Sequence, residues 1–85
     1  MELAEDRVHE RSDLLAELWA NGITSLNGRL LRTREVALLF QVSERAVTDW
    51  ARRGRLPSVR TPGGHRRYPA VAVRALLEGA GLAPR

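Results

Sequence analysis

Residues 60–68 constrain the fold most, because they force the chain to reverse direction. Pro62 fixes φ for the first corner of a β-turn, and Gly63 tolerates the positive φ that the second corner of a type II turn requires. We therefore expect two strands, at residues 58–61 and 65–68, joined by a type II turn. The second strand carries four polar side chains: His65, Arg66, Arg67 and Tyr68. A hairpin that presents guanidinium groups and a hydroxyl is suited to contact a polyanion.

Two short helices are predicted immediately before this hairpin. Thr33 is the expected N-cap of the first helix and Ser43 that of the second, because a side-chain oxygen there satisfies a free backbone N–H group. The second helix should run from about residue 44 to residue 53, and Gly54 then provides a left-handed C-terminal cap. Val42 is expected to fill the corner between the helices. Two short helices joined by about three residues form a helix-turn-helix.

Helical geometry divides the second helix into two faces. Val47 and Trp50 share the face that is expected to pack inward. The outward face carries Arg45, Thr48, Asp49 and Arg52. An outward polar face of this kind can lie in the major groove of DNA. There, Arg45 is the best candidate for a bidentate contact with guanine, and Thr48 for a contact with a thymine methyl group or a phosphate. Asp49 would orient a neighbouring arginine or accept a hydrogen bond from cytosine. The alternative is a solvated helix face with internal ion pairs.

The hairpin also has two faces, because successive side chains of a strand point to opposite sides. His65 and Arg67 share one face and Arg66 and Tyr68 the other, so one pair can enter the minor groove while the other holds the backbone. The Tyr68 ring is expected to pack while its hydroxyl reaches a phosphate. A basic hairpin that serves only solubility is the alternative. The candidate DNA-binding residues are Arg34, Ser43, Arg45, Thr48, Asp49, Arg52, Arg53, Arg60, Thr61, His65, Arg66, Arg67 and Tyr68.

Charge is distributed unevenly along the chain. Residues 1–28 hold two arginines and six acidic residues, a balance of −4, whereas residues 29–85 hold twelve arginines and four acidic residues, a balance of +8. All fourteen cationic residues are arginine. Arginine binds phosphate and guanine as a planar fork, although codon bias in a GC-rich genome is an equal explanation. An acidic segment on a basic body indicates a polyanion partner for the body.

The remaining segments frame this basic body. Residues 21–29 contain two Asn-Gly pairs and are interpreted as a linker, and Pro69 is expected to begin a third helix. Residues 3–20 are predicted to form an amphipathic helix, with an apolar face of Val8, Leu14, Leu15, Leu18 and Trp19. The expected fold is mainly α with a small β-hairpin. It consists of a winged helix-turn-helix at residues 29–85, preceded by the acidic helix and linker at residues 1–28.

Composition argues against several other functions. Eighty-five residues form one domain with no room for a deep catalytic cleft, and no catalytic arrangement is found, so an enzyme is not expected. Two histidines far apart and no cysteine argue against a metal site. No phosphate-binding glycine loop is present, so no cofactor is expected. Without an apolar run of membrane-spanning length or a signal-peptide pattern, we expect a cytoplasmic, nucleoid-associated protein and no membrane partner.

Residues 31–77 resemble the DNA-binding domain of the MerR family. The closest resemblance is to the small BldC-like regulators of actinobacteria and to excisionase-type helix-turn-helix proteins. It lies in Thr-x-Glu-Val-Ala at 33–37, Val-Thr-x-Trp-Ala-x-x-Gly-x-Leu at 47–56 and Arg-Thr-x-Gly-Gly-His-Arg-Arg-Tyr at 60–68. The resemblance implies that the second helix enters the major groove. It also implies that Arg66 and Tyr68 contact the DNA backbone.

The chain departs from the family pattern in three features. MerR regulators continue into a dimerising helix and an effector domain, which this chain is not expected to have; BldC-like proteins lack both and associate head to tail on direct repeats. Asp49 stands where close relatives carry a basic residue, so no base preference is carried over. The acidic segment 1–28 is not generally needed by short family members. It would pair two chains, dock on another protein or, most commonly for such a helix, cover its own core.

Three functions remain open. The leading interpretation is a sequence-specific transcription regulator of the BldC-like kind, with double-stranded DNA as its partner. It would self-associate head to tail or through the N-terminal helix. The second is an excisionase, which bends attachment-site DNA for an integrase. The third is a protein-interaction module whose N-terminal helix recruits a partner such as a transcription factor.

Overall fold

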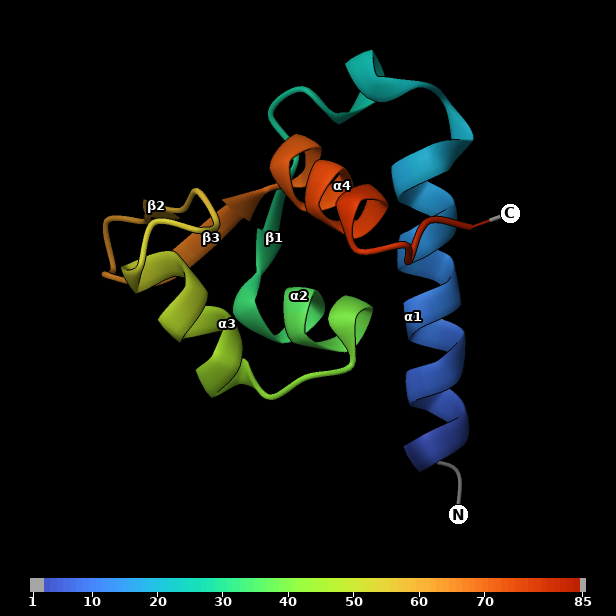
Figure 1. Ribbon diagram of the computed structural model, residues 1–85, viewed down its shortest axis with the longest axis horizontal. Helices are drawn as coiled ribbons and strands as arrows, with labels where there is room; N and C mark the ends of the chain where they lie inside the picture. Colours follow the sequence, from blue (N-terminus) through green and yellow to red (C-terminus); the bar gives the residue numbers. More distant parts are fainter. Residues whose placement is uncertain (1–2, 85) are drawn as a thin grey trace.

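The computed structural model describes the backbone of residues 3–84 and the side chains of residues 9–84. Val8, expected on the apolar face of the first helix, therefore lies outside the described side chains. The elements are α1 (Leu3–Ala20), the 3-10 helix η1 (Ile23–Leu26), β1 (Leu30–Arg32), α2 (Thr33–Phe40), α3 (Glu44–Arg52), β2 (Val59–Arg60), β3 (Arg66–Pro69) and α4 (Ala70–Gly79). This mainly helical chain with a small antiparallel sheet has the expected winged helix-turn-helix architecture (Figure 1).

Helix α1 packs on the rest of the chain. It lies beside α2 and α4 and opposite the β2–β3 hairpin (Figure 1). Leu14 and Leu18 are buried in the same core as Leu31, Val47 and the residues of α4. The acidic helix thus covers its own core, as such helices most commonly do. The expected linker is also ordered, since η1 forms within it and buries Leu26.

The sheet has a strand that the sequence did not predict. Strand order is β1-β3-β2, with β3 antiparallel to both neighbours. Leu31 of β1 pairs with Tyr68, and Val59 of β2 pairs with Arg67. The hairpin return strand is therefore the centre of the sheet rather than its edge. A strand of three residues shows almost no alternation, so only its pairing with a distant partner reveals it.

The expected helix starts are half right. Ser43 is the N-cap of α3, and its Oγ accepts a hydrogen bond from the Ala46 backbone N–H at 3.1 Å. Thr33, however, is the first helical residue of α2 rather than its N-cap. The N-cap is Arg32, whose backbone N–H donates to the Glu35 carboxylate at 2.8 Å. A glutamate at the third helical position thus satisfies the start of α2 without a capping hydroxyl.

Glycine follows the ends of both α3 and α4, at Gly54 as expected and also at Gly81. Gly54 has a φ of 74° and follows α3. Its N–H donates to Ala51 O at 3.1 Å, and the N–H of Arg55 donates to Trp50 O at 2.9 Å, which is the Schellman arrangement. Gly81, with a φ of 76°, has the same place after α4. At the other end of α4, Pro69 is the residue before the helix and not its first residue.

The expected type II turn at the wing tip is wrong. A type II turn requires positive φ at Gly63, but the positive φ, of 84°, is at Gly64. The Gly64 N–H donates to Thr61 O at 2.8 Å, and the Thr61 N–H donates to His65 O at 2.8 Å. This is the pattern of a type I turn followed by a left-handed glycine, a common longer hairpin connection. Gly63 and Gly64 can adopt a positive φ equally well, so the sequence did not show which of them would do so.

Candidate nucleic-acid interface

Helix α3 turns its polar face outward, as predicted. Val47 is fully buried, and Trp50 is half-buried with its ring edge-on to Phe40, 5.3 Å between centroids. Arg45 and Arg52 are exposed on the other side of the helix. Val42 does not fill the corner between α2 and α3, because the residue is 37% exposed. The outward arginines are therefore free to meet a ligand.

The two polar residues between these arginines are less open. Thr48 and Asp49 are half-buried, and the Thr48 hydroxyl donates to the Glu44 carbonyl at 3.1 Å. Among the side chains that the structure describes, Asp49 makes no ion pair with an arginine. The suggestion that Asp49 orients a neighbouring arginine thus has no support in the free protein.

The start of α3 borders a cavity of about 340 Å³. Its lining residues come from α1, from α2 and from the turn into α3: Glu10, Arg34, Ala37, Leu38, Val42, Ser43 and Glu44. Candidate residues Arg34 and Ser43 thus meet at one surface hollow although they lie on different helices. Free N–H groups at a helix start favour anions, but the Glu10 and Glu44 carboxylates line the same hollow. Arg34 is already engaged there by the Glu10 carboxylate.

Each arginine of the wing donates a hydrogen bond to a neighbouring backbone carbonyl or hydroxyl group. Arg60 Nη1 donates to Gly64 O at 3.1 Å, Arg66 Nη1 donates to Ser58 Oγ at 2.9 Å, and Arg67 Nη1 donates to Arg66 O at 2.9 Å. Arg60 is exposed, whereas Arg66 and Arg67 are half-buried. Each guanidinium has five N–H groups, so one internal bond leaves donors for a phosphate.

Two smaller members of the candidate set shape the wing tip. Thr61 is half-buried, and its Oγ1 accepts a hydrogen bond from the backbone N–H of His65 at 3.2 Å. The His65 side chain is exposed.

Arg53, the residue after α3, is also exposed. The structure therefore brings a solvent-exposed cation to each of the three candidate segments: α2, α3 and the wing.

Tyr68 lies in the core. Its ring packs as expected, but the whole residue is 0% exposed. Its hydroxyl is hydrogen-bonded by Thr33 Oγ1 at 3.2 Å, because the central strand runs directly beneath the start of α2. The expected contact between the Tyr68 hydroxyl and a phosphate is therefore not available in this conformation. The resemblance suggested a surface position that burial does not allow.

Several arginines hold the fold together and are not on the candidate surface. Arg11 Nε donates to Leu39 O at 3.0 Å near the end of α2, and Arg74 Nη1 donates to Leu18 O at 3.0 Å near the end of α1. Both guanidinium groups satisfy carbonyls that a helix end leaves free. Arg74 also lies 5.0 Å from the Trp19 ring centroid, a cation–π distance. Counting arginines in the sequence did not separate these structural residues from the free ones.

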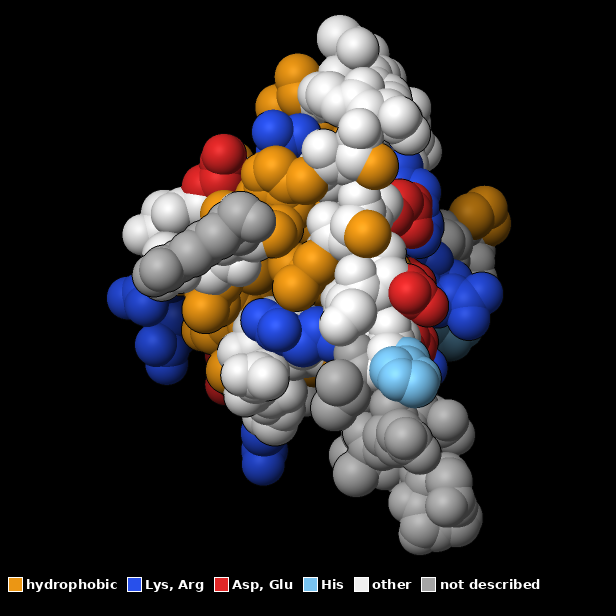
Figure 2. Space-filling view, turned by 90° about the vertical axis from the view of Figure 1, so that its right-hand side faces the viewer, with side chains coloured by type: hydrophobic (Ala, Val, Ile, Leu, Met, Phe, Trp, Pro, Cys, Tyr) orange, Lys and Arg blue, Asp and Glu red, His pale blue; other side chains and the backbone are white. Residues whose placement is uncertain are grey.

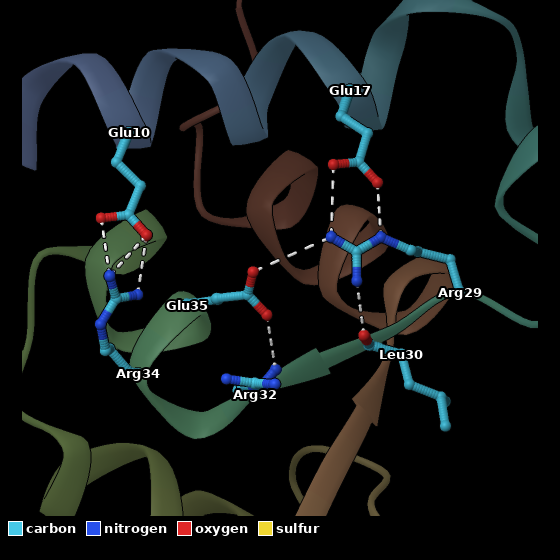
Figure 3. A network of polar contacts seen from close by, with 7 residues as sticks. All are labelled: Glu10, Glu17, Arg29, Leu30, Arg32, Arg34 and Glu35. Atoms are coloured by element: carbon cyan, nitrogen blue, oxygen red, sulfur yellow. Dashed lines mark hydrogen bonds and ion pairs between the residues drawn. The ribbon is translucent and has the colours of Figure 1, made fainter.

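Ion pairs join α1 to the helix-turn-helix. Arg29 binds the Glu17 carboxylate through Nε at 2.5 Å and Nη2 at 3.3 Å, and lies 3.8 Å from Glu35 (Figure 3). The hydrogen bond from Arg29 lowers the pKa of the Glu17 carboxyl. In the same way, the hydrogen bonds to Glu10 raise the pKa of Arg34. Figure 2 shows acidic side chains along α1, with arginines on one side and an apolar patch on the other.

Other kinds of site are not seen in the described part of the chain. Within it, no group of three or more His, Asp or Glu side chains is placed to hold a metal ion. No helix among these residues is both long and apolar enough to cross a membrane.

The fold defines a protein of the winged helix-turn-helix class, and a family match supports sequence-specific DNA binding. Residues 30–81 match the helix-turn-helix domain family, and the chain belongs to that family. The matched region begins in β1 and continues past the end of α4, so α1 lies outside it. The comparison with curated proteins found no significant match to this sequence. Proteins of this family typically act by binding rather than by catalysis.

Proposed function

We propose that this protein is a small transcription regulator that binds a specific duplex site. Helix α3 would lie in the major groove, and the β2–β3 wing would contact the backbone and the adjacent minor groove. The observation that carries the proposal is the exposed face of α3, because Arg45 and Arg52 point away from a core that Val47 anchors. The wing follows α3 after residues 53–58 and lies, like α3, on the side away from α1 (Figure 1).

Each group has a distinct task in this complex. Arg45, the second residue of α3, would form the bidentate contact with guanine, and Arg52, its last residue, would bind a phosphate. On the wing, Arg60 and Arg66 would neutralise the backbone. Tyr68 would act from the core by keeping the wing strand in register beneath α2. In a bacterial cell, these contacts would place the protein on the nucleoid.

The test is a random-site DNA selection with the purified protein at near-physiological salt, read by sequencing. An enriched motif supports specific binding. Motifs repeated in direct orientation at a fixed spacing indicate head-to-tail association, and an inverted repeat indicates a two-fold dimer. Binding without enrichment contradicts sequence-specific regulation.

A second candidate is an excisionase that bends attachment-site DNA for an integrase. The family match supports it, since this helix-turn-helix family is excisionase-like. The same face of α3 and the same wing would then serve architecture rather than regulation. Electrophoretic mobility of the bound motif at different positions along a fragment measures bending. A strong bend, together with an integrase gene beside this one, favours the excisionase.

The third interpretation, a module that recruits a protein through α1, has lost part of its motivation. Leu14 and Leu18 face the chain's own core. Leu15 and Trp19 remain half-buried, which leaves little of the apolar stripe for a partner.

A further inference from the structure

One acidic residue of α1 occupies a candidate DNA-binding arginine. Arg34 Nη1 and Nη2 both donate to the Glu10 carboxylate, at 2.6–2.8 Å (Figure 3). Arg34 is the second residue of α2, and Glu10 lies 24 residues earlier on α1. The fork of the guanidinium is therefore filled only because α1 packs beside α2.

This pair lies at the start of α3. Glu10, Arg34 and Ser43 line the same cavity, and Ser43 caps the helix whose outer face is proposed to read DNA. A duplex laid along α3 brings its backbone toward this end of the helix. The guanidinium fork fits a carboxylate and a phosphate in the same bidentate way. Glu10 thus holds Arg34 in the manner in which a DNA phosphate would.

The exchange needs no movement of α1. The Arg34 side chain is 58% exposed and that of Glu10 is 35% exposed, so both reach solvent. Exposed ion pairs are weak, and a side-chain rotation is enough to break this one.

We infer that Glu10 competes with DNA phosphate for Arg34, and that Arg34 exchanges the carboxylate for a phosphate when DNA binds. The inference rests on the proposed function. It gives α1 a role beyond covering the core: Glu10 masks one cation of a strongly basic body, which weakens binding to every duplex. Masking of this kind limits non-specific binding, because that binding is almost wholly electrostatic.

The test measures affinity of the full chain for a duplex with the selected motif, by fluorescence anisotropy over a range of salt concentrations. Glu10→Gln keeps the side-chain size and removes the charge. The matched control is Asp13→Asn, which removes one charge from the same helix at an exposed position; among the side chains of residues 9–84, Asp13 makes no ion pair. We expect E10Q to bind about two- to fivefold more tightly than D13N, the scale of one exposed pair. The advantage should shrink as the salt concentration rises, because salt screens the competing Glu10–Arg34 pair of D13N, whereas Arg34 contacts the same phosphate in both complexes.

A second background separates competition from a general charge effect. In Arg34→Ala, the advantage of E10Q over D13N should vanish, because no fork remains to be released. Equal affinities of E10Q and D13N, or an advantage that persists without Arg34, overturn the inference. Either result leaves wild-type DNA binding and the proposed function intact. If no variant binds any duplex while circular dichroism shows folded protein, the proposed function and the inference both fail.

Discussion

Thr33 Oγ1 donates a hydrogen bond to the Tyr68 hydroxyl at 3.2 Å, which ties the first residue of α2 to the central strand of the sheet. The contact joins residues 35 positions apart and lies beneath the helix-turn-helix. The wing strand and α2 are thereby held in one relative position.

Tyr68→Phe should therefore reduce stability rather than affinity. It removes a buried hydrogen bond and leaves Thr33 Oγ1 with one partner fewer, at a cost of about 1 kcal/mol in the free energy of unfolding. Chemical denaturation measures this loss, and DNA affinity should stay within about twofold of the wild type, since a free-energy change of 0.4 kcal/mol corresponds to that factor. Thr33→Val is the matched control, because it removes the other partner. A large affinity loss in Y68F alone would show that the hydroxyl reaches DNA after all.

Leu18→Ala should lower the free energy of unfolding substantially, because α1 contributes Leu18 to the core. Leu18 is 1% exposed, and truncation of a buried leucine costs about 2–5 kcal/mol. Leu15→Ala, on the same helix but only half-buried, should cost clearly less. Thermal unfolding followed by circular dichroism compares the two variants. Equal small losses would mean that α1 is dispensable for folding.

The hydrophobic pattern was enough to predict the helices, the outward face of α3 and the side of α1 that packs. Leu14 and Leu18 of α1 are four residues apart and Val47 and Trp50 of α3 are three apart, and this helical spacing places each pair on one buried or half-buried face. The hydrophobic pattern did not predict which groups the polar side chains contact. The burial of Tyr68 depends on β1, a three-residue strand defined only by its pairing with β3. Likewise, the engagement of Arg34 depends on α1 packing beside α2, a tertiary contact with no local signal.

Gly64→Ala should strain the wing, whereas Gly63→Ala should not. Gly64 has a φ of 84° and open space around an added Cβ, so the cost is conformational alone, about 1–2 kcal/mol for a left-handed residue. At Gly63 an added Cβ lies 3.4 Å from a flexible His65 carbon, at an ordinary φ. Denaturation midpoints of the two variants decide where the positive φ lies. A lower denaturation midpoint for Gly63→Ala than for Gly64→Ala would instead indicate the type II turn, with positive φ at Gly63.

Glu17 should make stability depend on pH at the acid end. Arg29 lowers the pKa of its carboxyl in the folded state, so its contribution is complete above the unfolded pKa of about 4.3 and fades as pH falls through the folded value. The pair is partly exposed, which limits the contribution to less than about 1 kcal/mol. Glu17→Gln should thus be less stable than the wild type at neutral pH, and the gap should close below the folded pKa. Asp13→Asn should show a smaller gap at neutral pH.

Arg66→Ala should weaken binding to all sequences alike. Arg66 lies on the wing strand with one bond to Ser58, and its remaining donors are proposed to neutralise a phosphate. Loss of one phosphate contact makes the salt slope shallower by about one unit. Arg55→Ala removes an arginine that borders the apolar cleft beside Trp50, outside the proposed interface, and should leave the slope unchanged. An unchanged slope in R66A would contradict the wing assignment.

Arg45→Ala should change which sequences are bound. Arg45 is exposed on α3, and a bidentate contact with guanine contributes about 1–3 kcal/mol of discrimination. We therefore expect weaker binding to the selected motif, little change on scrambled DNA, and relaxed preference at one base when the random-site selection is repeated. Arg52→Ala is the control on the same helix, since a phosphate contact should weaken both duplexes equally. If R45A retained the whole motif, α3 would not read that base through Arg45, and specificity would have to come from DNA shape or from other residues of the helix.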